Sequence, residues 1–269
     1  MSLADREWRL IAEESRPGPL QMALDEIAAE SAAEDGTRTL RVYRWEPGTL
    51  SLGYHQDPAT IDWAFCERAG ITVTRRPTGG GAIYHDNFGD ISYSVVAPAD
   101  ELPGDLMDSY ELLCEPLLDA FEGMGVDARF ADEERPAVYE PACYLRALHP
   151  AHDVVAGDGR KISGNAQYRQ KEAVVQHGSI TFAPTTERHL SCFADPDATA
   201  EAFDDRVTSV REQTGIGREA AVAELEGALR SWADAREGAW SETERSRARE
   251  RAREKYETDG WTRDGDDPL

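Results

Sequence analysis

Three consecutive glycines follow two arginines in the stretch RRPTGGGAIYHD, residues 75–86. Glycines leave the main-chain amide groups bare, so a ligand can approach the backbone of residues 79–81 closely. Arg75 and Arg76 bring positive charge into an acidic chain, which favours an anionic guest such as a phosphate or a carboxylate. The spacing matches neither the dinucleotide fingerprint GxGxxG nor a P-loop. The alternative is a tight hairpin or a bulge that binds nothing.

A second candidate for chemistry is Lys161, in the stretch GDGRKISGNAQYRQ. The chain has 29 basic residues, but only Lys161, Lys171 and Lys255 are lysines. A lysine that persists where arginine has taken nearly every other basic position suggests a role that arginine cannot fill. Its ammonium group is a compact donor for a phosphate or carboxylate oxygen. A surface lysine on a hairpin is the alternative.

The charge balance limits the possible partners. The 269 residues include 52 acidic and 29 basic side chains, a net charge of −23. Such a surface repels the phosphate backbone of nucleic acids, and it favours life at high internal salt, where the repulsion is screened. An ordinary acidic cytosolic protein is the alternative. No run of about 18 apolar residues predicts a membrane span, and the charged N-terminus lacks a signal peptide core. We therefore expect a cytoplasmic, halophilic protein with no membrane or nucleic acid partner.

Cysteine and histidine usage predicts neither a disulfide framework nor a metal site. Four cysteines lie far apart, at Cys66, Cys114, Cys143 and Cys192, which indicates reduced thiols that mostly fill the core. The six histidines show no metal-ligand spacing.

The elements that position these residues alternate irregularly. Periodicity and turn signals predict strands at 40–45, 49–55, 71–76, 90–98, 153–170 and 173–182, and helices at 19–36, 105–122, 217–235 and 241–257. This order is typical of an α+β fold rather than a doubly wound one. We expect one catalytic domain over residues 1–240. Residues 241–269 would form a solvated, charged helix and a disordered tail, with no separate accessory domain.

At this point the motifs become recognisable. RRPTGGGAIYHD closely resembles the glycine-rich motif of the lipoate–protein ligase A family, and GRKISGNAQ resembles the lysine motif of that family. QHGSITF, QMALDE and LSLGYHQ are also similar to it, so the resemblance extends from about residue 8 to residue 262. It implies the biotin/lipoate ligase catalytic-domain fold, a mixed, mostly antiparallel sheet flanked by helices.

The resemblance implies an enzyme that activates lipoate or octanoate with ATP and Mg²⁺ to an acyl-adenylate. The acyl group then passes to a lysine of a lipoyl carrier domain, on a 2-oxoacid dehydrogenase or a glycine cleavage H protein. Lys161 would be catalytic, because its ammonium group can stabilise charge on carbonyl and phosphoryl oxygens. Carried over by position, the ATP and lipoyl-adenylate site comprises Arg76, Gly79, Gly80, Gly81, Ala82, Ile83, Tyr84, His85, Asp86, Lys161, Gly164 and His177.

Three of these side chains have a structural reading as well. For His85 and Asp86, hydrogen bonds that shape the loop are favoured over proton transfer. His177 either lines the acyl pocket or is an ordinary strand histidine.

The chain also departs from the family. Asp90 replaces an asparagine, and its charge near a nucleotide is unfavourable unless it helps to hold Mg²⁺. The small C-terminal domain of the long ligases has no counterpart here, so a separate accessory subunit is a further expected partner.

The third departure is Cys143, which lies eighteen residues before Lys161. The related cysteine-dependent octanoyl transferases carry a nucleophilic cysteine in this region and take octanoate from acyl carrier protein through a thioester, without ATP. That branch often has arginine at the third glycine, so the intact Gly81 favours the ligase. The ligase is therefore our main expectation and the transferase, with Cys143 as nucleophile, the alternative. A biotin ligase would need a GRGRxG-type loop, and a non-catalytic carrier-binding protein would not need Lys161.

Overall fold

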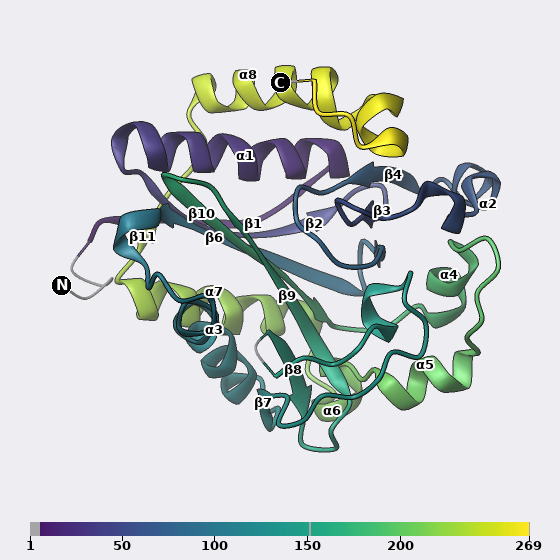
Figure 1. The fold of residues 1–269 in the computed structure, drawn as a ribbon. Helices are drawn as coiled ribbons and strands as arrows, with labels where there is room; N and C mark the ends of the chain where they lie inside the picture. Colours follow the sequence, from purple (N-terminus) through teal and green to yellow (C-terminus); the bar gives the residue numbers. More distant parts are fainter. Residues whose placement is uncertain (1–5, 151, 269) are drawn as a thin grey trace.

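A large mixed sheet forms the centre of the molecule. The computed structural model describes residues 6–150 and 152–268. The eight strands run in the order β11-β1-β2-β6-β10-β9-β8-β7 (Figure 1). β1 pairs in parallel with β2 and β11, and the other neighbours pair antiparallel. The bounds are β1 Trp8–Arg16, β2 Arg38–Trp45, β6 Asp90–Pro98, β7 Ala128–Phe130, β8 Asp153–Ala156, β9 Lys161–Arg169, β10 Ala173–Thr181 and β11 Arg236–Glu237.

A second, small sheet carries the glycine-rich motif. β3 (Thr49–Leu52) pairs in parallel with β4 (Thr72–Arg75) and antiparallel with β5 (Ile83–His85). The three glycines therefore lie in the connection from β4 to β5. The sequence predicted this arrangement, with a strand at 71–76 followed by the glycine loop.

Helices cover both faces of the large sheet. In Figure 1, α1 (Gly18–Asp35) lies over one face, with α8 (Glu242–Arg251) stacked outside it, and α3 (Leu106–Gly123) and α7 (Arg218–Ala233) lie on the other. Apolar clusters fill both interfaces. Shorter helices are α2 Trp63–Arg68, α4 Thr186–Ser191, α5 Ala200–Arg206 and α6 Val210–Thr214. Among the described helices, none combines the length and the apolar character that a membrane span requires.

Two expectations for the C-terminus are wrong. The last helix is not a solvated surface helix, because α8 packs on α1 and buries Ala248 completely. The tail is not disordered, because it folds into a helical turn, Gly260–Asp264, and buries Trp261. The buried apolar residues lie four or five positions apart in a mostly polar segment, so they make only a narrow stripe: Ala248, Ala252, Tyr256 and Trp261. Ion pairs from Arg247 and Arg251 to glutamates of α1 extend the contact. The proposed boundary after residue 240 remains a prediction.

Candidate active site

The two motifs meet at one cavity of about 340 Å³. Gly79 and Gly80 line it from the loop between β4 and β5, and Lys161 lines it from the start of β9. Aromatic and aliphatic side chains form part of its wall, which suits an apolar chain. These aromatic and aliphatic lining residues are Met22, Tyr43, Trp45, Ile83, Tyr110, Ala147 and Ala166.

Close backbone contacts explain two of the glycines around this loop. A Cβ atom on Gly53 would lie 1.9 Å from the carbonyl oxygen of Gly80, so the turn after β3 presses directly on the glycine loop. A Cβ on Gly81 would lie 2.6 Å from the carbonyl oxygen of Pro141 and 2.9 Å from the amide nitrogen of Cys143. Gly81 therefore makes room for another part of the chain, and this contact accounts for a glycine at position 81 without a bound nucleotide.

That other part is the turn that carries Cys143. The amide of Ala82 donates to the carbonyl of Pro141 at 2.7 Å, and the amide of Cys143 donates to the carbonyl of Ala82 at 2.8 Å. These two bonds dock the short helical turn Cys143–Leu145 on the glycine loop. Cys143 is half-buried and lines the cavity, whereas Cys66, Cys114 and Cys192 are buried elsewhere.

Lys161 is held at the cavity by an ion pair. Its amine lies 2.7 Å from Oδ1 of Asp153 and donates to the carbonyl of Cys143 at 3.4 Å, and the side chain is only 4% exposed. Burial opposes the charged amine, but Asp153 and Cys143 outweigh it and raise the pKa of Lys161 above its ordinary value. Burial likewise opposes the charge of Asp153, yet Lys161 and His152 hold the pKa of that carboxyl below its usual range. A fixed positive charge therefore lies beside Cys143.

The two arginines of the motif do different things. Arg76 lines the cavity, but each N–H group of its guanidinium has a protein acceptor, namely Thr78 Oγ1, both oxygens of Ser51 and the carbonyls of Gly79 and Gly81. It therefore shapes the glycine loop. Arg75 points away from the cavity and donates to carbonyls of the turn after β3 and of the C-terminal segment. The prediction that Arg75 helps to bind an anionic ligand is wrong, because alternate residues of β4 face opposite sides.

His177 lies in β10 at the wall of the cavity. Its Nε2 lies 2.8 Å from Oγ1 of Thr78, and its Nδ1 lies 3.6 Å from a carboxylate oxygen of Asp25. The same Asp25 pairs with the buried Arg41 at 3.0 Å. His177 thus lines the cavity and is also hydrogen-bonded to Thr78, and its contact with an acyl group remains a prediction.

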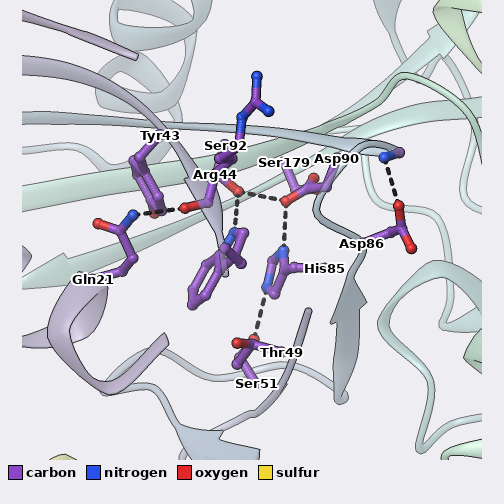
Figure 2. A network of polar contacts seen from close by, with 12 residues as sticks. Gln21, Tyr43, Arg44, Thr49, Ser51, His85, Asp86, Asp90, Ser92 and Ser179 are labelled. Atoms are coloured by element: carbon purple, nitrogen blue, oxygen red, sulfur yellow. Dashed lines mark hydrogen bonds and ion pairs between the residues drawn. The ribbon is translucent and has the colours of Figure 1, made fainter. Parts of the chain in front are cut away.

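A second histidine is enclosed in the network of Figure 2. Nδ1 of His85 donates to Asp90 at 2.8 Å, Nε2 lies 3.0 Å from the hydroxyl of Ser51, and Trp45 stacks on the ring. Burial lowers the pKa of His85, despite the opposing effect of Asp90. The neutral ring, with both nitrogens engaged, suits the loop-shaping role.

Hydrogen bonds stabilise the buried carboxylate of Asp90. Besides His85, the hydroxyls of Ser92 and Ser179 donate to its carboxylate. Three donors from β5, β6 and β10 thus stabilise this buried charge without a cation. Across residues 6–150 and 152–268, no group of three or more His, Cys, Asp or Glu side chains gathers in a way that suits a metal ion.

Strand alternation separates the remaining residues of the motif. Ile83 and His85 line the large cavity, whereas Tyr84 lines a small pocket on the other side of β5 together with Asp86. Asp86 caps the following turn by accepting the amides of Phe88 and Gly89. Of the residues carried over by position, Arg76, Gly79, Gly80, Ile83, His85, Lys161, Gly164 and His177 line the cavity, and Gly81, Ala82, Tyr84 and Asp86 do not.

Sequence reasoning missed several residues that line the cavity, including Arg146, His152, Asp153, Asn165 and Gln167. Asp153 had a usable signal. The structure divides the predicted strand 153–170 into β8 and β9, and the glycines at 157 and 159 mark the turn that brings Asp153 beside the strand of Lys161. The others lie on an irregular loop or on strand positions that no periodicity distinguishes.

Comparison with known proteins agrees with this geometry. The family model of the lipoyl protein ligase A/B catalytic domain matches residues 17–231. The octanoyltransferase LipM of Geobacillus kaustophilus is 30% identical over 283 residues, covering 96% of this chain and 99% of the relative. The octanoyltransferase LipM of an Exiguobacterium species is 35% identical over 195 residues, 70% of each chain.

Solved structures with the same fold are lipoate ligases. Lipoate-protein ligase A bound with ATP superposes with a TM-score of 0.79 at 26% identity, covering 96% of this chain and 99% of that one. A putative lipoate protein ligase from Thermoplasma acidophilum with bound lipoic acid gives a TM-score of 0.78 at 26% identity, with the same coverage. The bi-partite ligase of that archaeon, described with its E2 lipoyl domain, gives 0.78 at 25% identity and 96% of each chain.

The fold and the cavity thus define an α+β enzyme of the biotin/lipoate ligase type, and the predicted fold class is confirmed. This chain belongs to the lipoyl protein ligase A/B catalytic-domain family. It is a lipoate–protein ligase or a lipoyl/octanoyl transferase.

Proposed function

We propose that this enzyme is an octanoyl transferase that carries the acyl group as a thioester on Cys143 and delivers it to a lysine of a lipoyl carrier domain. The observation that supports this choice is the position of Cys143. Its turn is hydrogen-bonded to the glycine loop, and the charged amine of Lys161 donates to its carbonyl. The similarity to octanoyltransferases over 96% of the chain also favours the transferase over the ligase that we first expected.

The presence of glycine at position 81 does not favour the ligase over the transferase. In this chain Gly81 accommodates the backbone of Pro141 and Cys143, so its presence has a structural reason that does not depend on the ligase chemistry. The structural requirement comes from the cysteine turn itself.

The proposed reaction consists of two acyl-transfer steps, and the charged amine of Lys161 assists both. The Cys143 thiolate attacks the carbonyl carbon of an octanoyl thioester on a carrier protein, and the carbon–sulfur bond to the carrier's thiol breaks. That thiol leaves with the proton that Cys143 gave up. The ammonium group of Lys161, fixed by Asp153, stabilises the oxyanion of each tetrahedral intermediate. The neutral amine of the acceptor lysine then attacks the carbonyl carbon of the Cys143 thioester, the bond between that carbon and the sulfur breaks, and the proton that the amine loses passes to the leaving thiolate of Cys143.

The second candidate is the ATP-dependent ligase. The similar structure with bound ATP supports it. The carboxyl group of lipoate or octanoate would then be activated as an adenylate, with the charged amine of Lys161 placed to neutralise the phosphate. Here Cys143 would have no chemical role, so the two candidates differ in one side chain.

Incubation with octanoyl acyl carrier protein and no ATP tests the proposal. Intact-mass measurement should show one octanoyl group on the enzyme, and peptide mapping should locate it on Cys143. Cys143→Ser should abolish labelling and transfer to a lipoyl domain, whereas Cys66→Ala, which changes a buried thiol outside the cavity, should not. Unimpaired transfer by Cys143→Ser would contradict the proposal.

The ligase has its own measurement. Pyrophosphate release from ATP on addition of lipoate, with or without a candidate accessory domain, would support the second candidate. No release in either case would exclude it.

A further inference from the structure

Arg75 ties two distant segments of the chain together. Its guanidinium donates to the carbonyls of Gly53, Tyr54 and Gln56 at 2.8–3.0 Å, all in the turn after β3. It also donates to the carbonyls of Trp261, Thr262 and Arg263 at 3.0–3.2 Å, at the end of the last helical turn. The side chain is buried, and all six acceptors are main-chain oxygens. We call this set of contacts the Arg75 clamp.

The C-terminal segment closes the clamp from its own side. The indole Nε1 of Trp261 donates to the carbonyl of Arg75 at 2.7 Å, and the hydroxyl of Thr74 donates to the carbonyl of Tyr256 at 3.0 Å. Figure 1 shows this last segment, in yellow, beside β4. Residues 252–266 therefore pack against the small sheet at β4. They lie beyond the stretch 17–231 that matches the family model.

The clamp leads to the cavity in two further contacts. The turn that Arg75 holds includes Gly53, on which no Cβ would fit because the carbonyl of Gly80 lies against it. The amide of Tyr54 donates to the carbonyl of Thr78 at 2.8 Å, so the same turn is bonded to the start of the glycine loop. That loop carries the turn of Cys143 through Ala82. If the clamped turn moves, the glycine loop must therefore move with it.

We propose that the C-terminal segment, acting through Arg75, is a positioning element that holds the glycine loop and the Cys143 turn in register with Lys161. The inference rests on the acyl site proposed above. Arg75 touches no reacting group, so it is a positioning residue and not a catalytic one. Misplacement of a reacting sulfur by about 1 Å costs up to ~100-fold in rate, so loosening the clamp should change catalysis more than it changes folding.

Arg75→Lys is the sharpest change, because lysine keeps the positive charge but cannot bridge two groups of carbonyls with a planar fork. Trp261→Phe removes the indole donor and keeps an aromatic ring. Ala248→Gly is the matched control, because it weakens the packing of α8 on α1 without contacting the clamp. Each variant is made in the full chain, and its Tm is measured.

Two rates are then compared. We expect Arg75→Lys and Trp261→Phe to slow single-turnover acylation of Cys143 about tenfold, with little change in KM. We also expect them to change the rate of Cys143 alkylation by iodoacetamide at least about threefold. Ala248→Gly, at a comparable loss of Tm, should leave both rates within about twofold of the parent chain.

Equal effects in the clamp variants and the control, in proportion to Tm, would overturn the inference, and so would unchanged rates in the clamp variants. The alkylation rate does not depend on octanoyl transfer. It therefore still decides the matter if the parent chain fails to accept octanoate, which would count against the proposed function alone. If Arg75→Lys does not fold, Trp261→Phe decides.

Discussion

The amine of Lys161 and the carboxylate of Asp153 lie 2.7 Å apart, and both side chains are almost fully removed from solvent. The pair spans the β8–β9 hairpin, so the local strand pairing sets its geometry. Each charge stabilises the other in the protein interior, because an unpaired charge at either position would carry the full cost of desolvation. Lys161 is thereby kept charged inside the cavity rather than neutral.

Replacement of Asp153 should narrow the pH range of activity. Asp153 raises the pKa of Lys161 against the effect of burial, so in Asp153→Asn burial prevails and that pKa falls. Lys161 then loses its proton at a lower pH, and the alkaline limb of the kcat profile should move towards neutrality. Rates of acyl transfer measured across the alkaline range test this. Asp158→Asn, an exposed carboxylate of the same hairpin, should leave the limb in place. An unshifted limb in Asp153→Asn would contradict the role of the pair.

A methyl group on Gly81 should separate the glycine loop from the cysteine turn. The added Cβ would lie 2.6 Å from one backbone oxygen and 2.9 Å from a backbone nitrogen, neither of which can rotate away. We expect Gly81→Ala to lower kcat for octanoyl transfer about 100-fold, because Cys143 moves relative to Lys161. Gly104→Ala, a loop glycine with no atom within 4 Å of its Cβ position, is the control. If Gly81→Ala retained full activity, the docking of the two segments would not matter for catalysis.

The sequence predicted the general architecture and the two motifs well, because strand alternation and glycine spacing are local signals. It could not predict which arginine of the pair faces the cavity, since Arg75 ends β4 and Arg76 is the next residue, with its side chain on the opposite side of the extended backbone. The prediction of a disordered C-terminal tail was wrong for another reason. Trp261 and Ala248 are isolated apolar residues in a charged segment, and only α1 and β4 supply the surface that buries them.

Retention of a lysine in this arginine-rich chain does not by itself identify a functional residue. Lys255, like Lys161, is almost fully buried and ion-paired, with Glu26 and Asp267 as its partners. Lysine therefore persists in this chain at a structural position as well as at the candidate active site. What singles out Lys161 is the cavity that it shares with the glycine loop and Cys143.

The network around His85 gives a stability prediction. The carboxylate of Asp90 accepts from His85, Ser92 and Ser179, so it needs acceptors at both oxygens. In Asp90→Asn the amide nitrogen would face one of these donors, and a buried hydroxyl or ring N–H would lose its acceptor. We expect a loss of about 1–3 kcal/mol in the free energy of unfolding. Urea unfolding measures it, with Asp86→Asn as the control, since an asparagine oxygen can still cap that turn. Equal stability of Asp90→Asn and the parent chain would show that the position tolerates either residue.

Salt should stabilise this chain. At a net charge of −23, repulsion between carboxylates opposes the compact state, and the Debye length falls from about 10 Å at 0.1 M salt to about 3 Å at 1 M. The buried pairs Lys161–Asp153 and Arg41–Asp25 are shielded from ions by the protein, so screening should weaken the surface repulsion far more than these contacts. We expect Tm to rise steadily from low to molar KCl. If the carrier domain is acidic as well, docking to it should improve over the same range, because the two surfaces then repel each other less. Thermal unfolding and transfer rates in a KCl series measure the two effects, with sucrose at matched osmolality as the control for exclusion effects that do not depend on charge. A Tm that falls towards molar salt would mean that surface ion pairs such as those between α1 and α8, and not repulsion, dominate the electrostatics of folding.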